Sequence, residues 1–159
     1  MSTAYIWRVV ASALLLASCA QMGRAQLSSG PGVKSGFAEV NGGKLYYEVA
    51  GEGHALVLIH GGQMDSRMWD EQFALFSKSY RVIRYDVRGF GRSPASSNVF
   101  ADEEDLAGLL KMLGVQKAYV VGLSLGGRIA IDFTLAHPAL GAGLGPSATG
   151  SRGFRFGGY

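Results

Sequence analysis

Short apolar stretches separated by glycine-rich turns divide residues 37–137 into alternating strands and helices. The unbroken apolar run at 55–59 predicts a strand that is buried on both faces, as in parallel sheets covered by helices. The turn at 41–43 has the sequence Asn-Gly-Gly and predicts a hairpin, because Asn and Gly tolerate positive φ. The other predicted strands are residues 37–40, 45–49, 82–86 and 119–121.

Helical periodicity marks three further segments, residues 67–78, 102–113 and 128–136. In the first, Trp69, Phe73 and Phe76 recur at i, i+4 and i+7, which predicts an aromatic face in the core. The second has acids at 102–105 in its first turn and ends at Gly114. Strands that alternate with helices predict an α/β fold, a mainly parallel sheet with helices on both faces.

A nucleophile-elbow pattern lies between the last predicted strand and helix. In Gly122-Leu123-Ser124-Leu125-Gly126 the serine stands two residues from each glycine, which is typical of a strained strand-to-helix turn that exposes a nucleophile. A side chain at either glycine position is expected to collide with the neighbouring strand or helix. The following helix start directs backbone N–H groups and a positive dipole end toward a developing oxyanion.

Two further motifs occur in register with the elbow. His60-Gly61-Gly62 follows the strand at 55–59, and residues 85–93 (YDVRGFGRS) form a glycine-rich loop after the next strand. With these three motifs, residues 37–137 resemble the α/β-hydrolase family. Family members mostly hydrolyse esters, lactones, amides or activated carbon–carbon bonds in small molecules, without a cofactor or metal.

The resemblance implies a role for each motif. Ser124 would be the nucleophile, the backbone N–H groups of Leu125 and Gly62 the oxyanion hole, and His60 a residue that shapes the oxyanion loop rather than a general base. Relatives with an aspartate nucleophile, such as dehalogenases and epoxide hydrolases, are disfavoured by the serine. Proline iminopeptidases usually have proline after the double glycine, where this chain has Gln63.

The remaining two triad members are not evident. In this family the acid and the histidine follow the serine, and after Ser124 the chain has only Asp132 and His137, inside and at the end of the next helix. Residues 138–159 contain seven glycines, no Val or Ile and no acid, so we expect no sixth strand there and an exposed edge at 119–121. This pattern indicates the N-terminal part of a hydrolase domain with an aberrant or disordered tail. The alternative is a non-catalytic fragment or binding module that retains the elbow.

The acids elsewhere in the domain have ordinary structural interpretations. Asp86 is expected to pair with a nearby arginine such as Arg88. The acid cluster at 102–105 is expected to serve the helix dipole and solvent rather than a metal.

Charge and cysteine usage exclude several functions. Between Phe37 and His137 there are ten basic and twelve acidic residues, so no basic stripe suggests nucleic-acid binding, although the whole chain has a formal charge of +3. A single cysteine, Cys19, excludes an intramolecular disulfide and a thiolate-based zinc site. The expected partner is a small-molecule substrate, and the oligomeric state is left open.

The N-terminus has the pattern of an export signal. Arg8 precedes an apolar run at 9–17 that is too short to span a bilayer but suits a signal peptide. Cleavage before Cys19, within Leu-Ala-Ser-Cys, would give a lipoprotein anchored to the membrane. Cleavage after Ala25 would give a soluble periplasmic or secreted protein. We therefore expect a signal at 1–25 and a linker at 26–36.

Overall fold

The structure is a computed structural model and describes residues 32–147. The expected signal peptide, Cys19, most of the linker and residues 148–159 lie outside the described residues. The elements are β1 (Lys34–Val40), β2 (Gly43–Ala50), β3 (Ala55–Ile59), η1 (Ser66–Trp69), α2 (Asp70–Phe76), β4 (Arg81–Tyr85), α3 (Asp102–Met112), β5 (Ala118–Leu123), α4 (Leu125–Ala136) and β6 (Gly141–Ser147).

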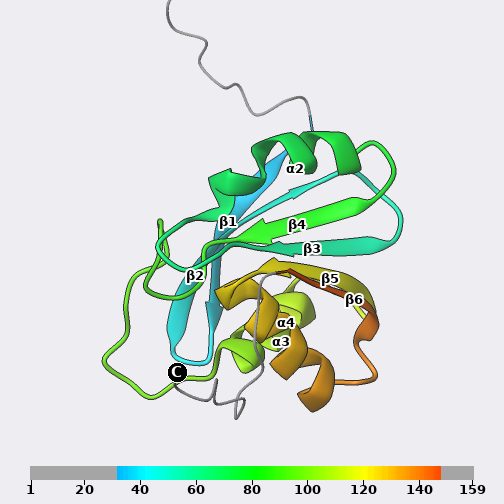
Figure 1. The fold of residues 1–159 in the computed structure, drawn as a ribbon. Coiled ribbons are helices and arrows are strands. Elements are labelled where there is room, and N and C mark those ends of the chain that lie inside the picture. The colour runs from blue at the N-terminus through cyan, green and yellow to red at the C-terminus, as the bar shows by residue number, and fades with distance from the viewer. Residues whose placement is uncertain (1–31, 148–159) are drawn as a thin grey trace, which may run out of the picture. The chain divides into compact units, whose positions relative to one another are not determined.

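The strands form one sheet in the order β1-β2-β4-β3-β5-β6 (Figure 1). β4, β3, β5 and β6 are mutually parallel, whereas β2 is antiparallel to both β1 and β4. The predicted hairpin turn is confirmed, with Asn41 and Gly42 at φ 47° and 70°. The α/β fold with a mainly parallel sheet is therefore confirmed.

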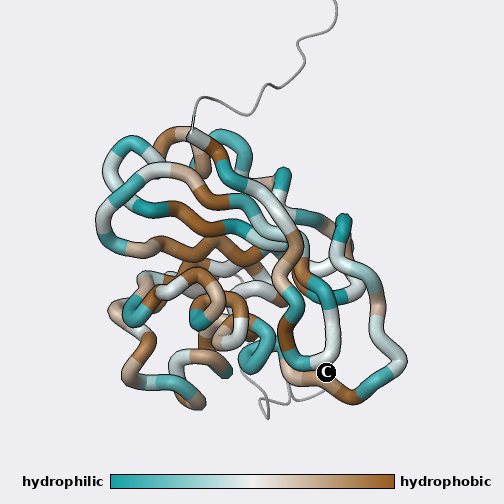
Figure 2. The backbone as a smooth tube through the Cα atoms, turned by 180° about the vertical axis from the view of Figure 1, so that it is seen from behind, coloured by the Kyte–Doolittle hydropathy of each residue, from teal (hydrophilic) through white to brown (hydrophobic). Residues whose placement is uncertain are grey.

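Helices cover the two faces of the sheet separately, with α2 on one face and α3 and α4 on the other (Figure 1). On the α2 face, Phe73 packs with Leu56, Leu58 and Val82, and Trp69 and Phe76 are partly buried against them, which confirms the predicted aromatic face. The larger core lies under α3 and α4 and includes Val57, Ile59, Leu106, Leu109, Ile129 and Phe133. Figure 2 shows the corresponding hydrophobic stretches running along the central strands.

The expectation that the chain has no sixth strand is wrong. β6 pairs with β5 in parallel register along its length, with a bulge near Ala118, so β5 is not an edge strand. The glycines of β6 make room for the side chains of β5. A Cβ added at Gly143 would lie 2.9 Å from the Tyr119 ring, and one at Gly145 would lie 3.2 Å from Val121.

The predicted helices differ from the observed ones mainly at their starts. The segment predicted at 67–78 is a 3₁₀ turn, η1, followed by α2, and Asp65 caps η1 by accepting the Arg67 N–H at 2.9 Å. α4 begins at Leu125 rather than at residue 128, because the elbow passes directly into the helix. The helices between residues 32 and 147 are each too short or too polar to span a membrane.

Candidate active site

Ser124 occupies the junction between β5 and α4 in a strained backbone conformation. Its backbone angles, φ 51° and ψ −108°, lie outside the regions that residues with a Cβ normally adopt. The residue is exposed at the carboxyl edge of the sheet. Such a conformation persists where the surrounding structure fixes it, and strained conformations cluster at active sites.

The two elbow glycines provide this constraint. A Cβ at Gly122 would lie 2.2 Å from the Gly126 backbone, and a Cβ at Gly126 would lie 2.3 Å from the carbonyl oxygen of Ile59. These are backbone atoms, which cannot move aside as the end of a flexible side chain can. The expected steric reason for glycine at both positions is confirmed, since it lets α4 begin directly against β3.

The register of β3 and β5 brings the oxyanion loop next to the elbow. Ile59 pairs with Gly122, so the residues that follow each strand leave the sheet side by side. A Cβ built on Gly62 would lie 3.8 Å from the Leu125 Cβ, an ordinary contact. Leu125 is the first residue of α4, where backbone N–H groups have no partner within the helix. The structure thus brings together Ser124, Leu125 and Gly62.

His60 is buried, and both of its ring nitrogens make hydrogen bonds that hold the oxyanion loop. Its Nε2 accepts the Val87 N–H at 2.9 Å, which requires the proton on Nδ1, and Nδ1 donates to the Gly61 carbonyl at 2.7 Å. The ring also packs edge-on against Phe90, with centroids 5.6 Å apart. With both nitrogens occupied, His60 has no lone pair for a Ser124 proton, so its expected structural role is confirmed.

Asp86 also has a structural role, but not with the partner expected. Its carboxylate accepts the backbone N–H groups of Ser66 and Arg92, each at 2.8 Å, and lies 3.6 Å from the Arg92 guanidinium. Arg88 instead points to α3 and makes two 2.6 Å hydrogen bonds to Asp105. The expected pairing of Asp86 with a nearby arginine is therefore confirmed, but the arginine is Arg92 and not Arg88, because Asp86 closes the loop after β4 against η1.

The acid cluster of α3 is more buried than expected. Asp105 is buried in its pair with Arg88, and Asp102 accepts a hydrogen bond from Arg128 of α4 at 3.0 Å. Burial raises the pKa of the Asp102 carboxyl, and Arg128 opposes this shift. These two acids bind neighbouring elements rather than solvent.

The described residues provide no base for Ser124. His137 lies at the other end of α4, roughly 18 Å along the helix axis, and its Nε2 contacts Glu104 at 3.0 Å. Asp132 lies 3.7 Å from Arg128, one turn away on the same helix. Neither residue reaches the elbow, as the sequence indicated.

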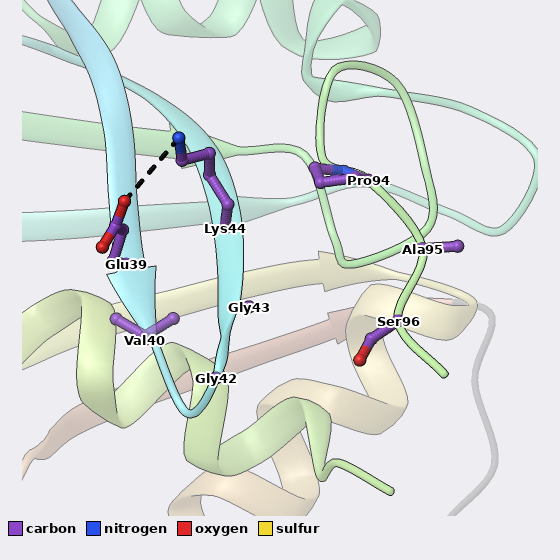
Figure 3. Close-up of a pocket in the computed structure, with 8 residues that line it drawn as sticks. All are labelled: Glu39, Val40, Gly42, Gly43, Lys44, Pro94, Ala95 and Ser96. Atoms are coloured by element: carbon purple, nitrogen blue, oxygen red, sulfur yellow. Dashed lines mark ion pairs between the residues drawn. The ribbon is translucent and has the colours of Figure 1, made fainter. Parts of the chain in front are cut away.

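No group of three or more potential metal ligands occurs within residues 32–147. A hollow of about 580 Å³ lies between the β1–β2 turn and the loop at 94–96 (Figure 3). It is lined by Glu39, Val40, Gly42, Gly43, Lys44, Pro94, Ala95 and Ser96, and Lys44 pairs with Glu39 at 3.7 Å. None of the elbow residues lines it, so it is separate from the nucleophile.

Gln63 stands where proline iminopeptidases usually have proline, and the sequence predicts no further role for it. In the structure it has φ 62° at the third position of a turn that the Met64 N–H closes on the Gly61 carbonyl at 3.3 Å. That position usually requires glycine or asparagine. The sequence signal was a Gln directly after two glycines, which by itself does not indicate a left-handed residue.

Comparisons with known proteins agree with this geometry. A sequence profile of the family described as alpha/beta hydrolase fold matches residues 54–140, more than half of the chain. Over 106 residues the chain is 32% identical to a 2-hydroxy-6-oxononadienedioate/2-hydroxy-6-oxononatrienedioate hydrolase of Comamonas testosteroni. That match covers 60% of this chain but 36% of the relative's length.

Two solved structures show the same arrangement. The enol-lactonase from Burkholderia xenovorans LB400 superposes with a TM-score of 0.63 at 34% identity, covering 66% of this chain and 44% of that one. The epoxide hydrolase CorEH gives a TM-score of 0.66 at 29% identity, covering 69% and 40%. The chain therefore matches less than half the length of each relative.

Proposed function

Because the chain belongs to the alpha/beta hydrolase fold family, we propose that it supplies the nucleophile and oxyanion hole of a serine hydrolase. Ser124 attacks the acyl carbon of the substrate. The N–H groups of Leu125 and Gly62 then stabilise the oxyanion. Preorganised donors of this kind contribute most where charge develops in the transition state.

The observation that carries this proposal is the exposed Ser124 held at positive φ by Gly122 and Gly126, beside Gly62. A serine that only capped α4 would accept a hydrogen bond from the first turn of the helix. Ser124 makes no such side-chain bond. The strained conformation therefore serves exposure of the hydroxyl rather than helix capping.

The substrate class we propose is a small-molecule ester, lactone or related acyl compound. The name of the enol-lactonase supports it. The Comamonas relative is named for a 2-hydroxy-6-oxo dienedioate, in which the corresponding carbonyl is a ketone. The likeness to an epoxide hydrolase concerns the fold, and the serine at the elbow favours acyl transfer. The acid and base of the triad come from outside residues 32–147.

The test joins the chain to the C-terminal part of the Comamonas hydrolase, where the order of the family's triad places the acid and the histidine. We expect a fluorophosphonate probe to label Ser124 in the joined protein and the Ser124→Ala variant to remain unlabelled. The 159-residue chain alone should turn over p-nitrophenyl esters slowly. Loss of a triad base costs on the order of 10⁶ in turnover and leaves roughly 10³ to 10⁴ over water.

The second candidate is a non-catalytic module that keeps the elbow without a triad, and it is favoured by the lack of a base near Ser124 among the described residues. Joined and isolated chains would then both remain unlabelled. Ordinary turnover by the isolated chain, lost in both Ser124→Ala and His137→Ala, would instead make His137 the base. It would contradict the proposal that the base comes from outside residues 32–147 and leave Ser124 as the nucleophile.

We also propose that the protein is exported, on the signal-like pattern at 8–25 and on Cys19. Expression in a bacterial host should give a membrane-associated product that Cys19→Ser releases or leaves unprocessed. Intact-mass analysis decides between the two cleavage sites. A mature protein that begins at Gln26, unaffected by the substitution, would exclude the lipid anchor and retain export.

A further inference from the structure

Three residues other than glycine have clearly positive φ in the described part of the chain: Asn41 at 47°, Gln63 at 62° and Ser124 at 51°. Positive φ is costly for a residue with a Cβ, so each should have a compensating use. Asn41 uses its side chain within the fold, because its Nδ2 donates to Asp105 at 3.0 Å. Ser124 is the proposed nucleophile, which leaves Gln63 unexplained.

Nothing in the fold uses the Gln63 side chain. It is exposed, and its amide makes no hydrogen bond to another residue in the range 32–147. Glycine would adopt the same backbone without a steric cost. The fold therefore gains nothing visible from the carboxamide, while the turn must hold it in an unfavourable conformation.

The turn that holds Gln63 is firmly anchored. The Gly61 carbonyl accepts both the Met64 N–H and the His60 Nδ1–H, and the Gly61 N–H contacts the Met68 sulfur at 3.4 Å. Gln63 directly follows Gly62, where an added Cβ would lie 3.8 Å from the Leu125 Cβ at the elbow. The backbone of Gln63 is thus held next to the proposed oxyanion-hole residue Gly62, and its exposed side chain is free of hydrogen bonds within the described part of the fold.

We propose that Gln63 is a specificity-determining residue whose carboxamide donates a hydrogen bond to an oxygen of the substrate close to the scissile carbonyl. This inference rests on the proposed function and goes beyond it by naming the substrate class: acyl compounds with an oxygen acceptor next to the reacting carbon. A site that pairs with such an oxygen discriminates against the analogue that lacks it, because the amide is then left unpaired.

The test compares two esters of equal length, p-nitrophenyl methoxyacetate and p-nitrophenyl butyrate, on the chain joined to the C-terminal part of the Comamonas hydrolase. They differ by one oxygen in place of one methylene. Gln63→Gly should lower the ratio of kcat/KM for methoxyacetate over butyrate roughly tenfold, the effect of one lost hydrogen bond. Gln63→Asn, which keeps the amide and tolerates left-handed backbone, should recover part of it.

The matched control is Asn41→Gly, which also replaces a left-handed side chain by glycine but lies at the β1–β2 turn. It should leave the ester ratio unchanged. If Gln63→Gly changes both esters equally while hydrolysis still depends on Ser124, the inference is overturned and the proposed function stands. If wild-type hydrolysis is unaffected by Ser124→Ala, both are overturned.

Discussion

At the scale of single residues, Arg88 and Asp105 form a buried ion pair. The two side chains are 1% and 3% exposed, and Arg88 also donates to the Val40 carbonyl at 3.0 Å and stacks on Phe100. The pair thus connects the loop after β4 to α3 and to the end of β1. A bidentate, buried ion pair is strongly directional, and removing one partner leaves an uncompensated charge.

Asp105→Ala should therefore lower the free energy of unfolding by about 3–5 kcal/mol. The control is Glu104→Ala on the same helix. Glu104 pairs with His137 at the exposed surface, where such pairs contribute about 0–1 kcal/mol. Urea unfolding of the three proteins measures both effects. Equal losses for the two variants would mean that the Arg88–Asp105 pair is not what fixes the loop.

At the scale of elements, the β5–α4 elbow depends on the absence of two side chains. Gly126→Ala should destabilise the protein by about 3 kcal/mol, because the added methyl meets the backbone oxygen of Ile59 at 2.3 Å and must displace β3 or α4. Gly62→Ala is the control, since its Cβ would make only ordinary contacts near 3.8 Å. Thermal unfolding compares the two. A Gly126→Ala protein as stable as Gly62→Ala would contradict the close approach of α4 to β3.

The start of η1 predicts a pH effect. Hydrogen bonding by Arg67 holds the pKa of the Asp65 carboxyl at about 2, below its ordinary value of 3.8. Because the pKa of Asp65 is lowered in the folded state, its carboxylate stabilises the fold above about pH 4, and this stabilisation is lost as the pH falls toward 2. Asp65→Asn should therefore lose less stability on acidification than wild type. The effect should be small, because Arg67 is exposed and water screens the ion pair.

Urea midpoints of wild type and Asp65→Asn at about pH 5 and about pH 2.5 test this expectation. The urea midpoint of wild type should exceed that of Asp65→Asn at about pH 5, and this difference in midpoint should be smaller at about pH 2.5. A difference that is the same at both values would show that Asp65 acts only as a neutral cap of η1.

At the scale of the whole molecule, β6 determines whether the sheet ends in an apolar edge. β5 is apolar at residues 119–121 and has no proline that would block pairing with another strand. β6 covers it by pairing along its length. A chain that ends at Ala139 should expose the β5 edge and form oligomers, because unpaired strands recruit other chains. Size-exclusion chromatography of this version against the 159-residue chain gives the readout. Identical elution profiles would contradict a protective role for β6.

The sequence by itself determined the elements whose signals are local. Apolar stretches predicted β3 and β4, helical periodicity with acids in the first turn predicted α3, and the two glycines around Ser124 predicted the elbow. Each of these patterns reflects contacts within a few residues or burial on both faces. The family resemblance added that the backbone N–H groups of Gly62 and Leu125 together form an oxyanion hole. The catalytic roles of these two residues and of Ser124 remain predictions.

Only the tertiary structure decided the features that depend on distant neighbours. β6 contains no β-branched residue, and its glycines are needed only because the side chains of Tyr119 and Val121 occupy the space beside them. Its composition is therefore typical of a disordered segment although it forms a strand. Arg88 selects Asp105 rather than Asp86 because the β1–β2 turn and α3 converge on its guanidinium. The left-handed backbone of Gln63 likewise follows from a turn anchored by His60. For β6 and Arg88 the deciding contact joins residues that chain folding, and not sequence proximity, places together.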